Sequence, residues 1–150
     1  MPSIKLVIPP RIERMVKRAA KAAFPKETFG LLIGTITGDT LHFDELHIPE
    51  DVLQYSGNTA VYPQLHWFDE AEEIARESEA SIIGWVHSHP YSLKEVDGDR
   101  SLSERDMDLF QLPIAGVCTV HETKQKNGKI GLRASTRWWG PTVQVVVRAP

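Results

Sequence analysis

Two histidines of this 150-residue chain, His87 and His89, are separated by a single residue. They follow Ser81–Val86, a short apolar and β-branched run that predicts a buried strand. Because side chains alternate along a strand, both imidazoles should lie on one face and Ser88 on the other. Two imidazoles on one face can bind one metal ion. Pro90, which has no N–H to donate, is expected to end the strand.

A catalytic zinc site needs a third protein ligand and leaves a fourth position for water. Asp106 is a candidate, in what the sequence predicts to be the first turn of a helix. Ser103-x-x-Asp106 is also the pattern of a capping box, and Leu102 and Met107 fit a hydrophobic staple. Taken alone, a helix cap explains Asp106 better than a metal ligand does. The conjunction with the two histidines is what favours a metal site.

Together, these residues resemble the signature of the JAMM (MPN+) zinc metalloproteases, of the prokaryotic single-domain type. His87-Ser88-His89-Pro90 and Ser103-x-x-Asp106 match the family motif. The segment from Pro25 to Gly34 resembles the setting of the family's upstream glutamate, which is Glu27 here. The resemblance covers the chain from about Arg11 to Val120, with four matching pieces in the right order.

The chain departs from the family pattern between Pro90 and Ser103, where the loop is several residues longer than usual. This loop contains Asp97 and Asp99, either of which could be the third ligand instead of Asp106. The segment Tyr91–Arg100 is polar and acidic, as is typical of a loop that frames a site.

The resemblance implies roles for five residues. His87, His89 and Asp106 would hold Zn²⁺, which lowers the pKa of water toward about 7. Glu27 would take the proton of that water and pass it to the leaving amine, and Ser103 would donate to the oxyanion. Without the resemblance, Glu27 is a surface carboxylate beside Lys26, and Ser103 is an N-cap.

The resemblance also implies a substrate, namely the amide or isopeptide bond after the C-terminal tail of a ubiquitin-like or sulfur-carrier protein. Such tails commonly bind as an added strand. The sequence leaves deconjugation and precursor processing equally open. Two further alternatives are a non-catalytic MPN-type scaffold and a small-molecule amidase. There is no His-Glu-x-x-His pattern, and one cysteine excludes the Pro-Cys-x-x-Cys of zinc deaminases.

Length, composition and charge limit the class of protein that this chain can be. The length suits one domain over 1–150, and 41% hydrophobic with 25% charged residues is typical of globular proteins. The net charge of −3 gives no general reason to expect nucleic acid as a partner. Cys118 is the only cysteine, which excludes an internal disulfide. No apolar run is long enough for a membrane span and no signal pattern is present, so a cytoplasmic protein is expected; the oligomeric state stays open.

The expected fold class is α/β, and the resemblance implies the cytidine-deaminase-like JAMM/MPN fold with a mixed sheet between helices. Helical periodicity from Arg11 to Phe24 places Ile12, Met15 and Val16 inward and Glu13 outward. The remaining expected elements are strands over Ser3–Ile8, Phe29–Ile36, Thr40–Ile48, Ile114–Val120, Lys129–Thr136 and Val143–Arg148, helices over Asp69–Ala80 and Glu104–Gln111, and a turn at Trp138–Pro141.

Overall fold

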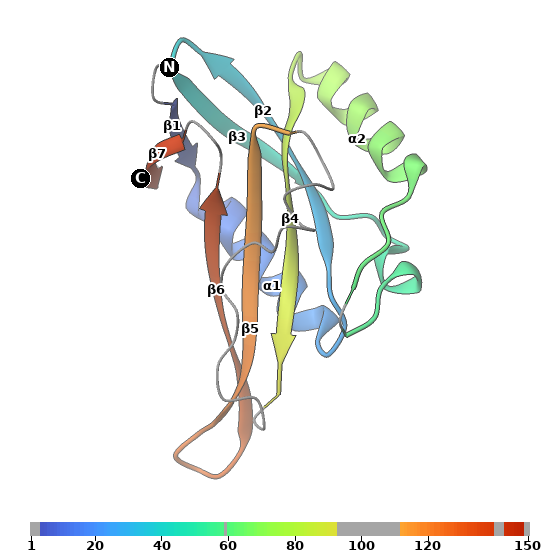
Figure 1. The fold of residues 1–150 in the computed structure, drawn as a ribbon, viewed down its shortest axis with the longest axis vertical. Helices are drawn as coiled ribbons and strands as arrows, with labels where there is room; N and C mark the ends of the chain where they lie inside the picture. The colour runs from blue at the N-terminus through green and yellow to red at the C-terminus, as the bar shows by residue number, and fades with distance from the viewer. Residues whose placement is uncertain (1–3, 59, 93–111, 140–142, 149–150) are drawn as a thin grey trace.

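The computed structural model describes residues 4–58, 60–92, 112–139 and 143–148. Within these residues, seven strands form one sheet in the order β6-β5-β4-β2-β3-β1-β7 (Figure 1). The elements are β1 (Ile4–Ile8), α1 (Pro10–Ala23), β2 (Phe29–Thr37), β3 (Thr40–His47), η1 (Val52–Tyr55, one 3₁₀ turn), α2 (Leu65–Glu77), β4 (Ser81–Tyr91), β5 (Ile114–Lys124), β6 (Ile130–Trp139) and β7 (Val143–Arg148).

The sheet is mixed, which confirms the expected fold class. β2 pairs antiparallel with β3 and β4, and β5 pairs antiparallel with β6. β4 runs parallel to β5, and β1 runs parallel to both β3 and β7. The β5–β6 hairpin extends beyond the neighbouring strands at the lower end of Figure 1. The expected helix over Glu104–Gln111 lies outside the described residues.

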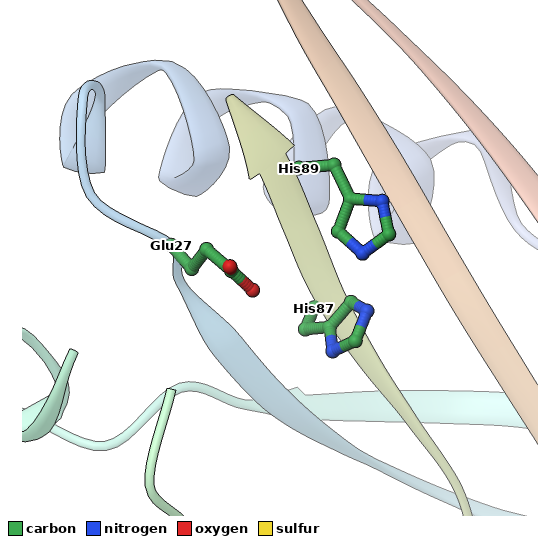
Figure 2. Close-up of side chains that lie close together, drawn as sticks. All are labelled: Glu27, His87 and His89. Carbon is green, nitrogen blue, oxygen red and sulfur yellow. The ribbon is translucent and has the colours of Figure 1, made fainter. Parts of the chain in front are cut away.

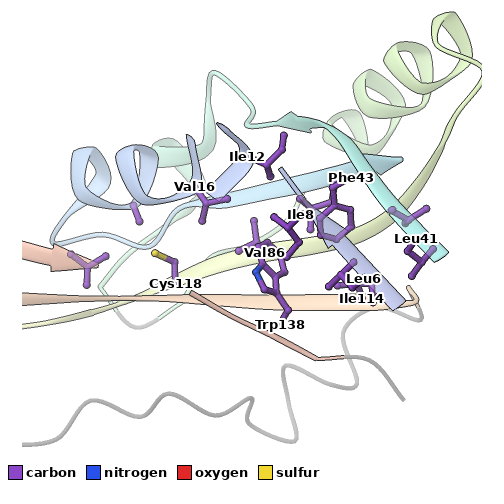
Figure 3. Close-up of a cluster of buried hydrophobic side chains, with 14 residues drawn as sticks. Leu6, Ile8, Ile12, Val16, Leu41, Phe43, Val86, Ile114, Cys118 and Trp138 are labelled. Carbon is purple, nitrogen blue, oxygen red and sulfur yellow. The ribbon is translucent and has the colours of Figure 1, made fainter. Parts of the chain in front are cut away.

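Alternating side chains divide the interior into two cores, one on each face of the sheet. On β2, Leu32 packs under α1, while Leu31 and Ile33 pack on the other face with Trp67 of α2. The α1 core includes side chains from β1, β3, β4, β5 and β6 (Figure 3). Because both faces of β2 are buried, nearly all residues of this strand are apolar. None of the described helices is both long and apolar enough to cross a membrane.

The indole of Trp138 explains two differences from the sequence-based expectations. Trp138 lies in β6 instead of a turn, and packs against Phe43 with 5.4 Å between ring centroids. Its Nε1 donates to Glu13 Oε1 at 3.3 Å, so Glu13 faces inward and is only 8% exposed. The prediction that Glu13 faces outward was therefore wrong. Helical periodicity cannot reveal that the carboxylate has a hydrogen-bond partner 125 residues away in the sequence. Met15, expected to face inward, is exposed.

Pro90 does not end β4, which continues to Tyr91. Among the described residues, β4 no longer pairs with β2 beyond His87, and only its ladder with β5 extends to Tyr91. A proline is tolerated where one side of a strand lacks a partner, because its missing N–H then breaks no ladder bond. The expectation that Pro90 opens the loop was wrong for this reason.

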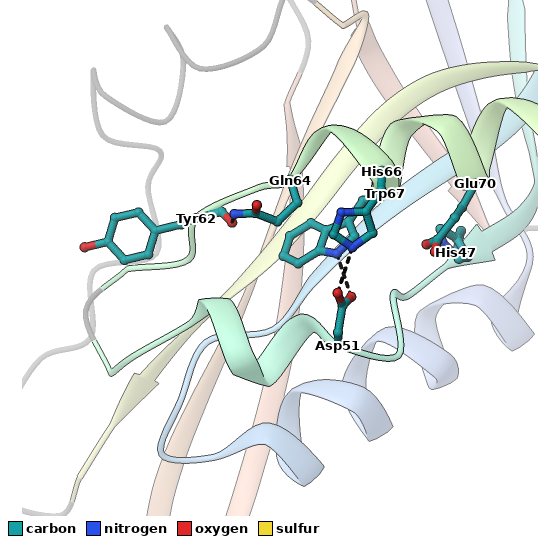
Figure 4. A network of polar contacts seen from close by, with 7 residues as sticks. All are labelled: His47, Asp51, Tyr62, Gln64, His66, Trp67 and Glu70. Carbon is teal, nitrogen blue, oxygen red and sulfur yellow. Dashed lines mark hydrogen bonds and ion pairs between the residues drawn. The ribbon is translucent and has the colours of Figure 1, made fainter.

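A polar network fixes α2 against the segment after β3 (Figure 4). Asp51 accepts from the buried Trp67 Nε1 at 2.7 Å, and its other oxygen lies 2.7 Å from His66 Nε2. His47 of β3 lies 2.9 Å from Glu70. These contacts explain why α2 begins at Leu65, four residues before the expected Asp69, although no side chain caps it.

Acid should weaken this network. Burial pushes the pKa of Asp51 up, but hydrogen bonds from His66 and Trp67 outweigh it and hold that pKa below the ordinary value of 3.8. A carboxylate with a lowered folded-state pKa stabilises the protein above its ordinary pKa, and this contribution disappears as pH falls through the folded value. Asp51→Ala should therefore lower stability to urea at pH 7. The difference from wild type should shrink as the pH falls below 3.8, the ordinary pKa of the carboxyl; a difference that stays constant with pH would contradict the assignment.

Candidate metal centre

Three candidate residues meet where β2 begins and β4 approaches its end. Phe29, the first residue of β2, pairs with His87 of β4. Glu27 precedes β2 by two residues, and its backbone N–H donates to the Gly57 carbonyl at 2.8 Å. Figure 2 shows the Glu27 side chain pointing across from β2 toward His87 and His89.

The ligand atoms of Glu27, His87 and His89 all lie within 4.8 Å of one another. The two imidazole centroids are 4.7 Å apart, as expected for side chains on one face of a strand. Glu27 is 5% exposed and His87 is 4% exposed, whereas His89 is half-buried. Trp85, two residues before His87 and on the same face, packs edge-on against the His87 ring with 4.9 Å between ring centroids. The group therefore has a buried side and a more open side at His89.

The donor set fits a first-row divalent metal. Imidazole nitrogen and carboxylate oxygen are ordinary zinc ligands, with bonds of about 2.0–2.2 Å. Such bonds place tetrahedral ligand atoms about 3.3 Å apart. Separations of up to 4.8 Å can close by small rotations of the three side chains. These residues would thus supply at least two imidazole ligands and a carboxylate that either coordinates the ion or acts beside it.

Ser88 holds the two sides of this centre together from the opposite face of β4. Its Oγ accepts from the Thr28 N–H at 2.8 Å, and its own N–H donates to the Thr28 carbonyl at 3.2 Å. Ser88 is fully buried. Because Thr28 follows Glu27 and Ser88 separates the histidines, these bonds fix the distance between the carboxylate and the imidazoles. The alternation had placed Ser88 away from the histidines, but local sequence held no signal for its partner.

Ser88→Ala should destabilise the protein and loosen the centre. The buried Thr28 N–H would lose its acceptor, at a cost of about 1–3 kcal/mol. Ser81→Ala, at the exposed start of the same strand, should change stability by less than about 0.5 kcal/mol. Urea unfolding of both variants measures the difference. Equal stability of Ser88→Ala and Ser81→Ala would show that the Ser88 bonds do not hold the centre.

Polar and aromatic residues continue the face beyond His89. Thr119 of β5 pairs in register with His89, and its Oγ1 lies 3.0 Å from Ser135 Oγ of β6. Tyr91 stacks on His121 with 5.1 Å between centroids. His121 Nε2 is buried and makes no hydrogen bond to the residues that the structure describes. These neighbours were not expected as part of the site, because they converge only through the β4–β5 and β5–β6 ladders.

The structure thus brings together three of the five predicted site residues. Glu27 is buried, so the purely local interpretation as a surface carboxylate was wrong. Ser103 and Asp106, and the alternative ligands Asp97 and Asp99, lie outside the described residues, and their roles stay predictions.

Comparison with known proteins defines the class to which this fold and site belong. The family described as prokaryotic homologs of the JAB domain matches residues 9–129. The chain therefore belongs to the prokaryotic JAB family. No curated protein sequence matches it significantly.

Solved structures show the same fold at low sequence identity. A JAB1/MPN domain protein from Archaeoglobus fulgidus is 21% identical with a TM-score of 0.50, over 97% of each chain. A protein from Desulfitobacterium hafniense is 16% identical with a TM-score of 0.58, over 96% of this chain and 92% of that one. A protein from Salinibacter ruber is 21% identical with a TM-score of 0.53, over 95% and 90%. These likenesses show the JAB/MPN fold.

Proposed function

We propose that this JAB-family chain is a zinc-dependent peptidase that cleaves the bond after the C-terminal tail of a ubiquitin-like or sulfur-carrier protein. The observation that carries the proposal is the buried Glu27 carboxylate, whose ligand atom lies within 4.8 Å of those of His87 and His89. A carboxylate serving only as a surface charge would not be buried against two imidazoles. Family membership supports the same class of site.

In this proposal His87, His89 and Asp106 hold the metal. A bound Zn²⁺ would supply Lewis acidity, which polarises the substrate carbonyl and lowers the pKa of water. Glu27 accepts the proton of the attacking water and delivers it to the leaving amine, a role that requires hydrogen-bond reach of both. The backbone bond from Glu27 to Gly57 and the Ser88–Thr28 pair hold its carboxylate in place. Ser103 donates a hydrogen bond to the developing oxyanion.

The half-buried His89 side of the centre supports a substrate that enters as an extended chain. Trp85 and Phe29 pack on the buried side of the centre, so a flexible tail would reach it from the side of His89. Main-chain hydrogen bonds supply much of the affinity in such complexes.

Cleavage of tail fusions tests the proposal. Zinc-loaded protein is incubated with a ubiquitin-like fusion and a sulfur-carrier fusion, each carrying a short extension after its C-terminal tail. We expect cleavage at the tail junction, its loss with a chelator and its return on adding Zn²⁺. A fusion with the tail sequence scrambled is the control. Intact fusions after incubation with fully zinc-loaded protein would favour the scaffold alternative, and cleavage that persists without metal would overturn the zinc mechanism.

A further inference from the structure

Five cationic residues line one depression between α1 and the β5–β6 hairpin. The depression has a volume of about 650 Å³. Its cations are Lys17, Lys21, Lys124, Lys126 and Arg133. We call this depression the cationic pocket. Neutral polar residues, Thr123 and Gln125, also line it, and no Asp or Glu is among the described residues that line it.

The cationic pocket lies on the face of the sheet opposite the metal centre. On β5, Cys118 and Val120 point into the core under α1, whereas Thr119 points to the face that carries His89. Burial raises the pKa of the Cys118 thiol to about 11, and the positive charges of Lys17 and Lys21 oppose that rise. Both amines therefore lie near the part of β5 that runs beneath α1.

Positive charge predominates among the described residues that line the cationic pocket. Two ion pairs of the described residues, His47–Glu70 and His66–Asp51, include no pocket cation. Glu122, the acidic residue next to Thr123 on β5, does not line the pocket. The chain as a whole has a net charge of −3. A concave group of like charges raises the local positive potential and attracts anions.

We propose that the cationic pocket binds a small polyanion that carries two or more phosphate groups. Its volume falls within the range of about 300–1,000 Å³ typical of small-ligand sites. Lysine amines bind phosphate as point charges. Lys17 and Lys21 come from α1, and Lys124 comes from the face of β5 that carries Cys118 and Val120. The ligand source is either a free polyphosphorylated molecule or a lipid headgroup, and both share this chemistry.

Inorganic tripolyphosphate is the probe for this site. It is titrated into ¹⁵N-labelled protein, and amide shifts are followed by NMR, in zinc-loaded protein and again after chelation because polyphosphates bind metals. We expect saturable shifts in residues 17–21 and 123–134 in both forms. Raising NaCl from about 0.05 M to about 0.3 M should weaken binding, because salt screens these exposed charges.

Matched variants decide the assignment. The triple variant Lys17→Ala, Lys21→Ala, Lys124→Ala should bind tripolyphosphate at least about tenfold more weakly, since each lost charge-assisted bond weakens binding severalfold. Arg14→Ala with Arg18→Ala, on α1 but outside the pocket, is the control and should bind as wild type does. Thermal melting confirms that both variants fold. Equal binding by triple variant and control would overturn the proposal.

Two further probes separate the ligand classes. Phosphatidylcholine vesicles with and without a bisphosphorylated lipid test whether the phosphate groups can belong to a lipid headgroup. Binding only to vesicles that contain the bisphosphorylated lipid would identify a headgroup as the ligand. A hexaglutamate peptide tests an acidic protein segment. Tighter binding of the peptide than of tripolyphosphate would overturn the small-polyanion assignment.

Discussion

Glu27→Gln should reduce turnover of a cleavable tail fusion by about 10²–10⁴-fold while the protein keeps its metal and its fold. Glutamine has nearly the same size as glutamate and still forms hydrogen bonds, but it cannot accept a proton from water at neutral pH. The backbone bond of residue 27 to Gly57 does not involve the side chain, so the segment before β2 should keep its place. Steady-state cleavage and metal content, measured on the same preparation, check both parts.

The same variant separates two roles that the geometry allows for Glu27. Because its carboxylate lies within 4.8 Å of both imidazole ligand atoms, it could coordinate the ion directly. A Glu27→Gln protein that loses zinc would show that Glu27 is a ligand. An inactive protein that retains zinc would support its role as the proton carrier, and full activity would remove Glu27 from the reaction. Glu45→Gln, on β3, is the matched control and should stay active.

His89→Ala should reduce zinc content from about one ion per chain to nearly none, because a site with three protein ligands loses most of its affinity with one of them. Metal that binds only the folded state also stabilises it, by about 2.7 kcal/mol at a hundredfold excess over Kd. Added Zn²⁺ should therefore raise the melting temperature of wild type but not of His89→Ala. Elemental analysis and thermal melting are the measurements.

His42→Ala is the control for the loss of a histidine elsewhere, since His42 lies on β3 away from the centre. It should keep both the zinc and the thermal shift. Unchanged zinc in His89→Ala would remove the metal assignment.

The third ligand is tested in the same assay. Asp106→Asn should lower zinc content strongly, whereas Asp97→Asn and Asp99→Asn should leave it near one per chain. If Asp97→Asn or Asp99→Asn loses its metal and Asp106→Asn does not, the third ligand comes from the loop between Pro90 and Ser103. All three carboxylates carry the same charge, so the comparison is free of a net-charge difference.

The features that the sequence predicted correctly are those set by local periodicity. The helix that became α1 and the alternation along β4 follow from residues within a few positions of one another, because helix and strand repeats are short. His87 and His89 were therefore predicted on one face, and the structure confirms it. The start of α2 was missed because no side chain caps it, and its first turn is held by contacts with Asp51.

The chain's residues alone determined its family motif, its fold class and the pairing of the two histidines on one strand face. Only the tertiary structure decided that Glu27 is buried beside them, because that depends on the β2–β4 ladder and on the bond between Thr28 and Ser88, 60 residues apart. It also decided that Glu13 is buried against Trp138 and that cations from α1 and the β5–β6 hairpin share one pocket. Each of these contacts joins distant segments, and a short-range pattern carries no information about which distant partner a side chain will meet.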